Sequence, residues 1–351
     1  MSLVLDAPLV PVTVPAVRIL PSPYLLFLGD TTEPGYAKTA FGLRDWARGR
    51  CIGENALPEA TVTTGLPRLT FAQAVERGAR ALVIGVANRG GVIPPSWQIA
   101  LIEALAAGLD IISGMHARLG DLPDVRAAAE RHGRELIDIR SPPADIPVAT
   151  GMKRGGRRLL TVGTDCALGK KYAALAIADG LGTRGVDATF RATGQTGIMI
   201  AGEGIPIDSI VADFVAGAAE LLSPDAASDH LDVIEGQGSL FHPAYAGVSL
   251  GLLHGSQPDM FVVCHAPDRL EILGHPGQPL PSIERVIEQT IALGQVTNPS
   301  IRCVGISLNT SALTADAAHA VIATTSLHHG LPAADPIRGG KAFEGLLDAC
   351  M

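Results

Sequence analysis

The chain has 351 residues, of which 47% are hydrophobic and 18% are charged, and its formal net charge at pH 7 is −8. This length suits a globular protein with two hydrophobic cores, and the acidic balance argues against nucleic-acid binding, which calls for excess basic surface. No apolar run approaches the ~20 residues of a membrane span and the five cysteines form no CxxC pair, so we expect a soluble cytoplasmic protein without a disulfide framework.

The first half of the chain alternates short apolar segments with segments of helical pattern. Four apolar segments are predicted strands: Tyr24–Leu28, Ala81–Gly85, Asp110–Ser113 and Glu135–Ile139. Two helices are predicted between them, at Pro95–Ala107 and Pro123–His132. Strands that alternate with helices indicate a parallel sheet, as in a Rossmann-like domain. The Gly-x-Gly-x-x-Gly fingerprint of dinucleotide-binding domains is nevertheless missing.

A proline-rich segment separates the two halves. Residues 141–147 read Ser-Pro-Pro-Ala-Asp-Ile-Pro, which cannot continue a helix, so we expect one domain over residues 1–150 and a second over 151–351. In the second domain the predicted strands are Arg158–Val162, Val186–Phe190, Leu231–Ile234, Met260–Cys264 and Ile301–Ser307. The predicted fold class is α/β, with two doubly wound parallel-sheet domains, a Rossmann-like domain followed by a P-loop NTPase-like domain.

The most specific motif is a phosphate-binding loop directly after the first strand of the second domain. A predicted helix, Lys171–Leu181, follows the loop. Glycines let backbone N–H groups close around phosphate oxygens, the helix N-terminus adds partial positive charge, and Lys170 adds a full charge. The plainer alternative is a tight turn with a solvated lysine. The residues assigned to cofactor binding are Gly163, Thr164, Asp165, Cys166, Ala167, Leu168, Gly169, Lys170 and Lys171.

The loop departs from a standard P-loop at two points. Five residues separate Gly163 from Gly169 instead of four, as in loops of dethiobiotin synthetase-like proteins. Lys171 stands where a Ser or Thr hydroxyl would bind Mg²⁺ in a nucleoside triphosphatase. Two consecutive lysines without a hydroxyl suit a ligand whose phosphates are neutralised by protein cations, and coenzyme A is one such ligand.

Further candidates follow the other strands of the second domain. Glu235 comes directly after the predicted strand at 231–234, where the carboxylate is a candidate general base or a partner for a substrate ammonium. His242 is a second candidate for the catalytic base. Gln195, Thr196 and Gln237 lie in glycine-containing loops that are predicted to bind substrate, although ordinary turns are the alternative.

Three candidate groups are predicted farther from the loop. Arg269 is expected to clamp a substrate carboxylate in bidentate fashion, and Ser256 is expected to contact substrate near the fourth strand. Asn88 and Arg89 follow a strand of the first domain and are expected to complete the site across the domain interface. No metal site is predicted, because the histidines share no metal-ligand spacing.

Several of these segments together resemble a two-domain bacterial family associated with D-glutamate N-acetyltransferase, whose members were often labelled NAD-dependent epimerase/dehydratase. The matching stretches are residues 163–170, 192–200, 234–240 and 254–259 in the second half, and 81–87 and 112–116 in the first. The resemblance implies acetyl transfer from acetyl-CoA to the amino group of a D-amino acid in a catabolic route. Tyr172 stands where a smaller hydroxyl residue is expected, which puts ligand fit in doubt.

Three functions compete at this stage. An acetyltransferase comes first, an ATP- and Mg²⁺-dependent ligase of the dethiobiotin synthetase kind second, and a non-catalytic nucleotide-binding regulator third. For each we expect a small-molecule ligand and a homo-oligomer, with neither a nucleic acid nor a membrane as partner. The sequence leaves open the acyl donor, the amino-acid side chain and the stereochemical preference.

Overall fold

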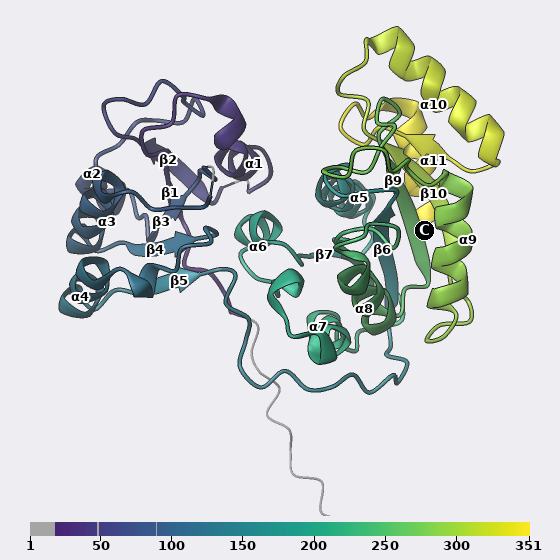
Figure 1. Ribbon diagram of the computed structural model, residues 1–351, viewed down its shortest axis with the longest axis horizontal. Coiled ribbons are helices and arrows are strands. Elements are labelled where there is room, and N and C mark those ends of the chain that lie inside the picture. The colour runs from purple at the N-terminus through teal and green to yellow at the C-terminus, as the bar shows by residue number, and fades with distance from the viewer. Residues whose placement is uncertain (1–17, 48, 89) are drawn as a thin grey trace, which may run out of the picture.

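The computed structural model describes residues 18–47, 49–88 and 90–351. Its first domain holds a five-stranded sheet in the order β2-β1-β3-β4-β5, and every strand pair in it is parallel (Figure 1). The strands are β1 (Tyr24–Phe27), β2 (Cys51–Asn55), β3 (Ala81–Ile84), β4 (Asp110–Ser113) and β5 (Leu136–Asp138). The helices are η1 (Pro34–Tyr36), α1 (Lys38–Trp46), α2 (Phe71–Glu76), α3 (Pro95–Ala107), η2 (Leu119–Asp121) and α4 (Pro123–His132).

Helices cover both faces of this first sheet. Helices α2, α3 and α4 lie on one face and α1 lies on the other (Figure 1). Strands β1 and β3 are buried along their whole length, because a parallel sheet covered on both faces favours continuous apolar runs.

The second domain holds a six-stranded parallel sheet in the order β11-β10-β9-β6-β8-β7. Its strands are β6 (Arg157–Gly163), β7 (Ala188–Arg191), β8 (Leu231–Ile234), β9 (Met260–His265), β10 (Arg302–Leu308) and β11 (Ala333–Ala334). Its helices are α5 (Lys170–Thr183), α6 (Gln195–Ala201), η3 (Ile207–Ser209), η4 (Ala212–Phe214), α7 (Val215–Leu222), α8 (Ala246–Ser256), α9 (Ile283–Gly294), α10 (Ala315–His329) and α11 (Gly340–Cys350).

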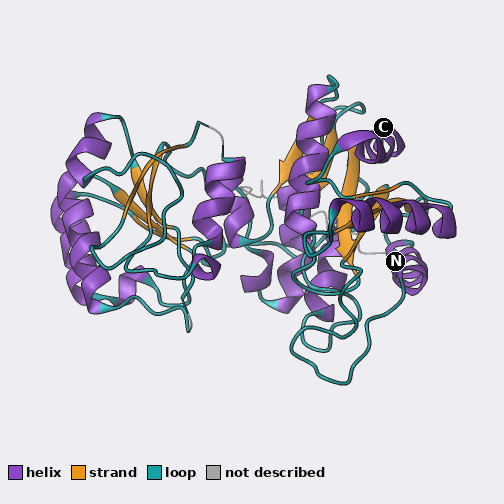
Figure 2. Cartoon of the chain, turned by 90° about the horizontal axis from the view of Figure 1, so that it is seen from above, coloured by secondary structure: helices purple, strands orange, loops and turns teal. Residues whose placement is uncertain are grey.

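Two hydrophobic clusters sandwich this second sheet, which has helices on both sides (Figure 2). Leu159 of β6 packs with residues of α5 and α11, whereas the next residue, Leu160, packs with residues of α7, α8 and α9. Successive strand residues point to opposite faces, so one apolar strand feeds both clusters. The predicted fold class, two doubly wound parallel-sheet domains, is confirmed.

Helix α6 joins the two domains. Its residues Ile198, Met199 and Ile200 are buried in the same cluster as the strands of the first domain, although α6 follows β7 of the second. The helix lies beside α1 between the two sheets (Figure 1). The hydroxyls of Thr196 on α6 and Thr39 on α1 are 3.5 Å apart. The start of α6 is therefore held by both domains.

Two strands, β2 and β11, were not predicted from the sequence. Strand β2 carries Gly53 and Glu54, which interrupt its apolar run, and β11 has only two residues. Among the described residues, no helix is both long enough and apolar enough to cross a membrane.

Candidate active site

The phosphate loop connects the carboxyl end of β6 to the amino end of α5, as predicted. Two of its residues, Ala167 and Gly169, have left-handed backbones with φ of 52° and 103°. The ammonium of Lys170 turns back into the loop and donates a hydrogen bond of 2.7 Å to the carbonyl of Asp165. Burial lowers the pKa of Lys170 below its usual range. The loop thus presents a buried cation at a helix N-terminus, where a phosphate group binds best.

Asp165 and Arg269 brace this loop. The buried Asp165 carboxylate accepts hydrogen bonds from the backbone N–H of Cys166 (2.7 Å) and of Leu273 (2.8 Å), and it pairs with Arg269 at 3.1 Å. Arg269 also donates to the Cys166 carbonyl at 2.7 Å. The expected substrate clamp needs correction, because the guanidinium of Arg269 is occupied by the loop itself.

Glu235 follows β8 and lies at the start of α6, with only 4% of its surface exposed. Its Oε2 accepts hydrogen bonds from the backbone N–H groups of Thr193 (3.0 Å) and Gly194 (3.1 Å). A Cβ at Gly197 would clash with Oε2, so the glycine leaves room for the carboxylate. Burial raises the pKa of Glu235 above the ordinary glutamate value, although Lys171 and the two N–H groups act in the opposite direction.

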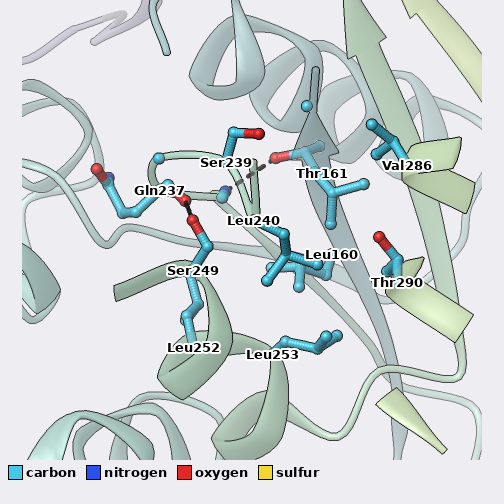
Figure 3. A pocket seen from close by; sticks show the side chains of 14 residues that line it. Leu160, Thr161, Gln237, Ser239, Leu240, Ser249, Leu252, Leu253, Val286 and Thr290 are labelled. Carbon is cyan, nitrogen blue, oxygen red and sulfur yellow. Dashed lines mark hydrogen bonds between the residues drawn. The ribbon is translucent and has the colours of Figure 1, made fainter. Parts of the chain in front are cut away.

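The segment after Glu235 is anchored on both sides. The N–H of Gly236 donates to the Thr161 hydroxyl at 2.9 Å, and Ser249 donates to the Gln237 carbonyl at 2.7 Å (Figure 3). The Gln237 side chain donates to the Thr193 hydroxyl at 2.9 Å. The cavity beside this segment has a volume of about 20 Å³, which is room for a water molecule rather than a substrate. These contacts hold Glu235 in place.

His242 lies close to the phosphate loop, which sequence spacing did not show. One imidazole nitrogen of His242, the Sγ of Cys166 and one carboxylate oxygen of Asp165 lie within 4.8 Å of one another. The Nδ1 of His242 accepts a hydrogen bond from the N–H of Ala244 at 3.1 Å, so the neutral ring carries its proton on Nε2. These three side chains offer metal-ligand atoms, but a cation there would compete with Arg269 for Asp165.

Gln195 and Thr196 occupy the first turn of α6 and face the first domain. A Cβ at Gly114, in the loop after β4, would clash with the Gln195 side-chain oxygen, so the two residues are in contact. The Thr196 hydroxyl faces Thr39 of α1. Both predicted substrate residues therefore lie at the seam between the domains, near Glu235.

The structure places the remaining predicted residues outside this group. Ser256 ends α8 directly before β9, so it lies at the amino edge of the sheet, and its hydroxyl donates to the Leu252 carbonyl at 2.6 Å. This prediction needs correction, because the phosphate loop lies at the opposite, carboxyl edge. The amide of Asn88 is hydrogen-bonded to the backbone of Val92 and closes its own loop. Arg89 lies outside the described residues.

A cavity of about 460 Å³ opens beside the phosphate loop, between the two domains. Four segments line it: α1, the start of α5, the end of β10 and the residues after β11. The lining residues are Phe41, Gly42, Asp45, Trp46, Leu168, Gly169, Tyr172, Ala173, Ser307, Leu308, Asn309, Ser311, Asp335, Pro336, Ile337 and Arg338. Its volume is typical of small-molecule sites. Sequence reasoning missed it, because no motif links these four segments.

This arrangement defines a class of protein. The phosphate loop joins a strand to a helix of a doubly wound sheet, and a second α/β domain accompanies it. These features are typical of a P-loop protein with a Rossmann-like partner domain. The chain belongs to the DUF1611 family: residues 147–343 match the family's C-terminal P-loop domain, and residues 52–142 match its N-terminal Rossmann-like domain.

Two curated relatives and one solved structure are similar to most of the chain. A D-glutamate N-acetyltransferase of Tritonibacter scottomollicae is 47% identical over 322 residues, which are 92% of this chain and 97% of the relative. A D-glutamate N-acetyltransferase of a Pseudoalteromonas species is 46% identical over 318 residues, or 91% of this chain and 96% of the relative. The crystal structure of a DUF1611 family protein from Anabaena variabilis is 33% identical with a TM-score of 0.81, covering 93% of this chain and 98% of its own. The family resemblance is confirmed.

Proposed function

We propose that this protein is an N-acetyltransferase that transfers the acetyl group of acetyl-CoA to the amino group of D-glutamate. The observation that carries the proposal is the likeness to two D-glutamate N-acetyltransferases, at 46% and 47% identity over at least 91% of this chain. Because both relatives are matched almost from end to end, the likeness includes both domains and the seam between them.

The geometry of the phosphate loop supports coenzyme A as the carrier. The loop offers a buried lysine and a helix N-terminus for a diphosphate, and no hydroxyl follows Lys170 to hold Mg²⁺. The neighbouring cavity of about 460 Å³ has room for the nucleoside part. Its walls include Trp46 and Tyr172, whose ring centroids are 6.2 Å apart. Aromatic side chains of this kind suit the flat face of a purine.

Glu235 supports the acceptor half of the reaction. An amino acid arrives at neutral pH with a protonated amine, which must lose a proton before it can attack the thioester carbonyl. Oε2 of Glu235 already accepts two backbone hydrogen bonds, which leaves Oε1 to receive that proton. The new C–N bond then forms as the C–S bond breaks, and the coenzyme A thiolate leaves and takes up a proton. His242 and Asp165 are the alternative bases.

A Mg²⁺-dependent ligase is the second candidate, because the loop spacing resembles dethiobiotin synthetase-like proteins. The two functions differ in what they consume. We expect acetyl-CoA and D-glutamate to release free coenzyme A thiol in excess EDTA without ATP, and a panel of D- and L-amino acids tests the acceptor. If no acceptor releases thiol while Mg²⁺-dependent ADP formation is seen in parallel, the ligase is the better description.

We further propose that the protein works in the cytoplasm, as a homo-oligomer, in amino-acid catabolism. Five unpaired cysteines in the described chain support a reducing compartment. Light scattering of the purified protein tests the oligomeric state.

A further inference from the structure

A second cavity, of about 430 Å³, lies at the carboxyl edge of the first sheet. Its walls come from the loop after β4, from the end of β5 with the residues that follow it, and from η3 of the second domain. The ionisable residues that line it are His116, Arg118, Asp138, Arg140 and Asp208. None of these residues lines the cavity beside the phosphate loop. In doubly wound sheets ligands bind outside the carboxyl ends of the strands, so this cavity has the position of a ligand site.

One ion pair crosses this cavity from domain to domain. Arg140, two residues after β5, pairs with Asp208 of η3 at 2.9 Å, and the side chains are 29% and 34% exposed. A guanidinium carries five N–H donors in a planar fork, and one carboxylate uses only part of them. Within the described ranges, Arg140 has no other ion pair. Arg140 therefore keeps donors for a carboxylate that enters the cavity.

Arg118 and Asp138 line the same cavity from the first domain. Both oxygens of the Asp138 carboxylate accept from the backbone N–H of Leu119, at 3.1 and 3.2 Å, which fixes this side chain in the wall. The Arg118 side chain is exposed and makes neither a hydrogen bond nor an ion pair with any residue that the structure describes. The cavity thus presents two guanidinium groups and a fixed carboxylate to one enclosed space.

We propose that this cavity is a second small-molecule site, which binds an acidic amino acid. Arg118 and Arg140 bind its two carboxylates, because a guanidinium matches a carboxylate in bidentate geometry, and Asp138 binds its ammonium. A volume of about 430 Å³ is within the range of small-molecule sites. The inference goes beyond the proposed function, because it concerns a ligand that is bound away from Glu235 and the phosphate loop and is not itself acetylated.

Both walls of the cavity are joined to residues around Glu235. The loop after β4 contacts the Gln195 side chain, at the start of α6, through Gly114. In η3, the N–H of Ile207 donates to the Thr193 carbonyl at 3.0 Å, and the N–H of Thr193 donates to Glu235 at 3.0 Å. A ligand that bridges the two walls therefore acts on the surroundings of Glu235, and we expect its binding to change kcat.

The first test titrates the purified protein with glutarate, a dicarboxylate without an ammonium, and follows the heat of binding. Arg118→Met should weaken glutarate binding about 10- to 100-fold, since a charge-assisted contact is lost. Arg131→Met is the matched control and should change nothing, because Arg131 is in the last turn of α4, at the amino edge. D-glutamate should displace glutarate, and Asp138→Asn should weaken D-glutamate as a competitor without weakening glutarate. Equal affinity of wild type and Arg118→Met for glutarate, or no binding to either, would overturn the inference.

The second test separates this cavity from the acceptor site of the proposed function. Glutarate should alter the kcat of acetyl transfer without competing with D-glutamate, and Arg118→Met should abolish this effect. Competitive inhibition that disappears in Arg118→Met would show that the cavity is the acceptor site itself, and an unchanged kcat at saturating glutarate would overturn the connection to Glu235. If the wild type transfers no acetyl group, the proposed function fails, and the calorimetric comparison alone decides whether the cavity is a ligand site.

Discussion

Charged residues lie near both edges of the sheet around strands β6 and β8, and the two edges differ in how those charges are paired. At the amino edge, Arg158 is 1% exposed and donates to the Ser223 hydroxyl at 2.7 Å and to several backbone carbonyls. Asp232 accepts from Arg191 and from Ser223, each at 2.6 Å. At the carboxyl edge, Glu235 accepts two backbone hydrogen bonds on Oε2, and no described residue donates a hydrogen bond to its Oε1.

The comparison shows that burial alone does not distinguish a structural charge from a functional one. Arg158 and Asp232 are as buried as Glu235, but their hydrogen-bonding capacity is used within the protein. A charge with its partners in place stabilises the fold, whereas one with an open position can bind a ligand or move a proton.

Glu235→Gln should produce the largest effect. A positioned base contributes about 10² to 10⁴ in rate, so turnover should fall by that factor while the Kd of coenzyme A changes little. The amide keeps the shape of the side chain and can still accept from Thr193 and Gly194. Steady-state kinetics measures the loss. Near-normal turnover would show that Glu235 is not the base and would leave His242 and Asp165 as the candidates.

Arg158→Met should destabilise the fold by disrupting the hydrogen bonds at the amino edge of the sheet. Removal of one member of a buried charge network costs about 3–5 kcal/mol, because the Ser223 hydroxyl and several backbone carbonyls lose their buried donor. Denaturant unfolding should show this loss in stability, while the folded enzyme at low temperature keeps its turnover. Arg157→Met, one residue earlier, is the matched control and should cost much less. A lower turnover of the folded Arg158→Met enzyme would contradict the assignment of a purely structural role to the charges at the amino edge.

Lys170→Ala should weaken the binding of phosphate ligands without unfolding the protein. The loss of one charge-assisted contact costs about 1.5–3 kcal/mol, or roughly 10- to 150-fold in Kd. Calorimetry with coenzyme A and with ADP measures it. Unchanged affinity for every phosphate ligand would show that the loop does not bind phosphate.

The activity should rise with pH through the pKa of Glu235. A base works only when deprotonated, and burial raises the pKa of Glu235, so the acid limb of kcat should lie above the ordinary glutamate range. Below this pKa the rate should fall about tenfold per pH unit. A pH profile measures the limb, and its persistence in Glu235→Gln would assign it to another group.

Ser256→Ala should have the smallest effect. The hydroxyl donates to the Leu252 carbonyl at 2.6 Å and to the Leu253 carbonyl at 3.4 Å, both in its own helix, so its loss should cost about 0.5–1.5 kcal/mol of stability. KM and kcat should both stay near the wild-type values, because Ser256 lies at the amino edge. A rise in the KM for D-glutamate would instead indicate that Ser256 contributes to substrate binding.

Much of the fold was predictable because buried parallel strands are continuous apolar runs. Strands β1 and β3 and helices α3 and α4 lie where the apolar periodicity predicts them. Strand β2 was missed because its buried Glu54 resembles a loop residue. In the folded chain that carboxylate accepts hydrogen bonds from the hydroxyls of Thr63 and Thr64, nine and ten residues away. A local pattern cannot show that such partners exist.

The phosphate loop and the position of Glu235 were determined by the sequence alone, because a glycine loop before a helix is a local feature and the carboxyl ends of parallel strands meet at one edge. Only the tertiary structure decided that Arg269 braces the loop, that Ser256 lies at the far edge, and that Arg118 and Asp208 line one cavity. These outcomes depend on segments distant in sequence, and a side chain's partners are set by packing, which no spacing along the chain records.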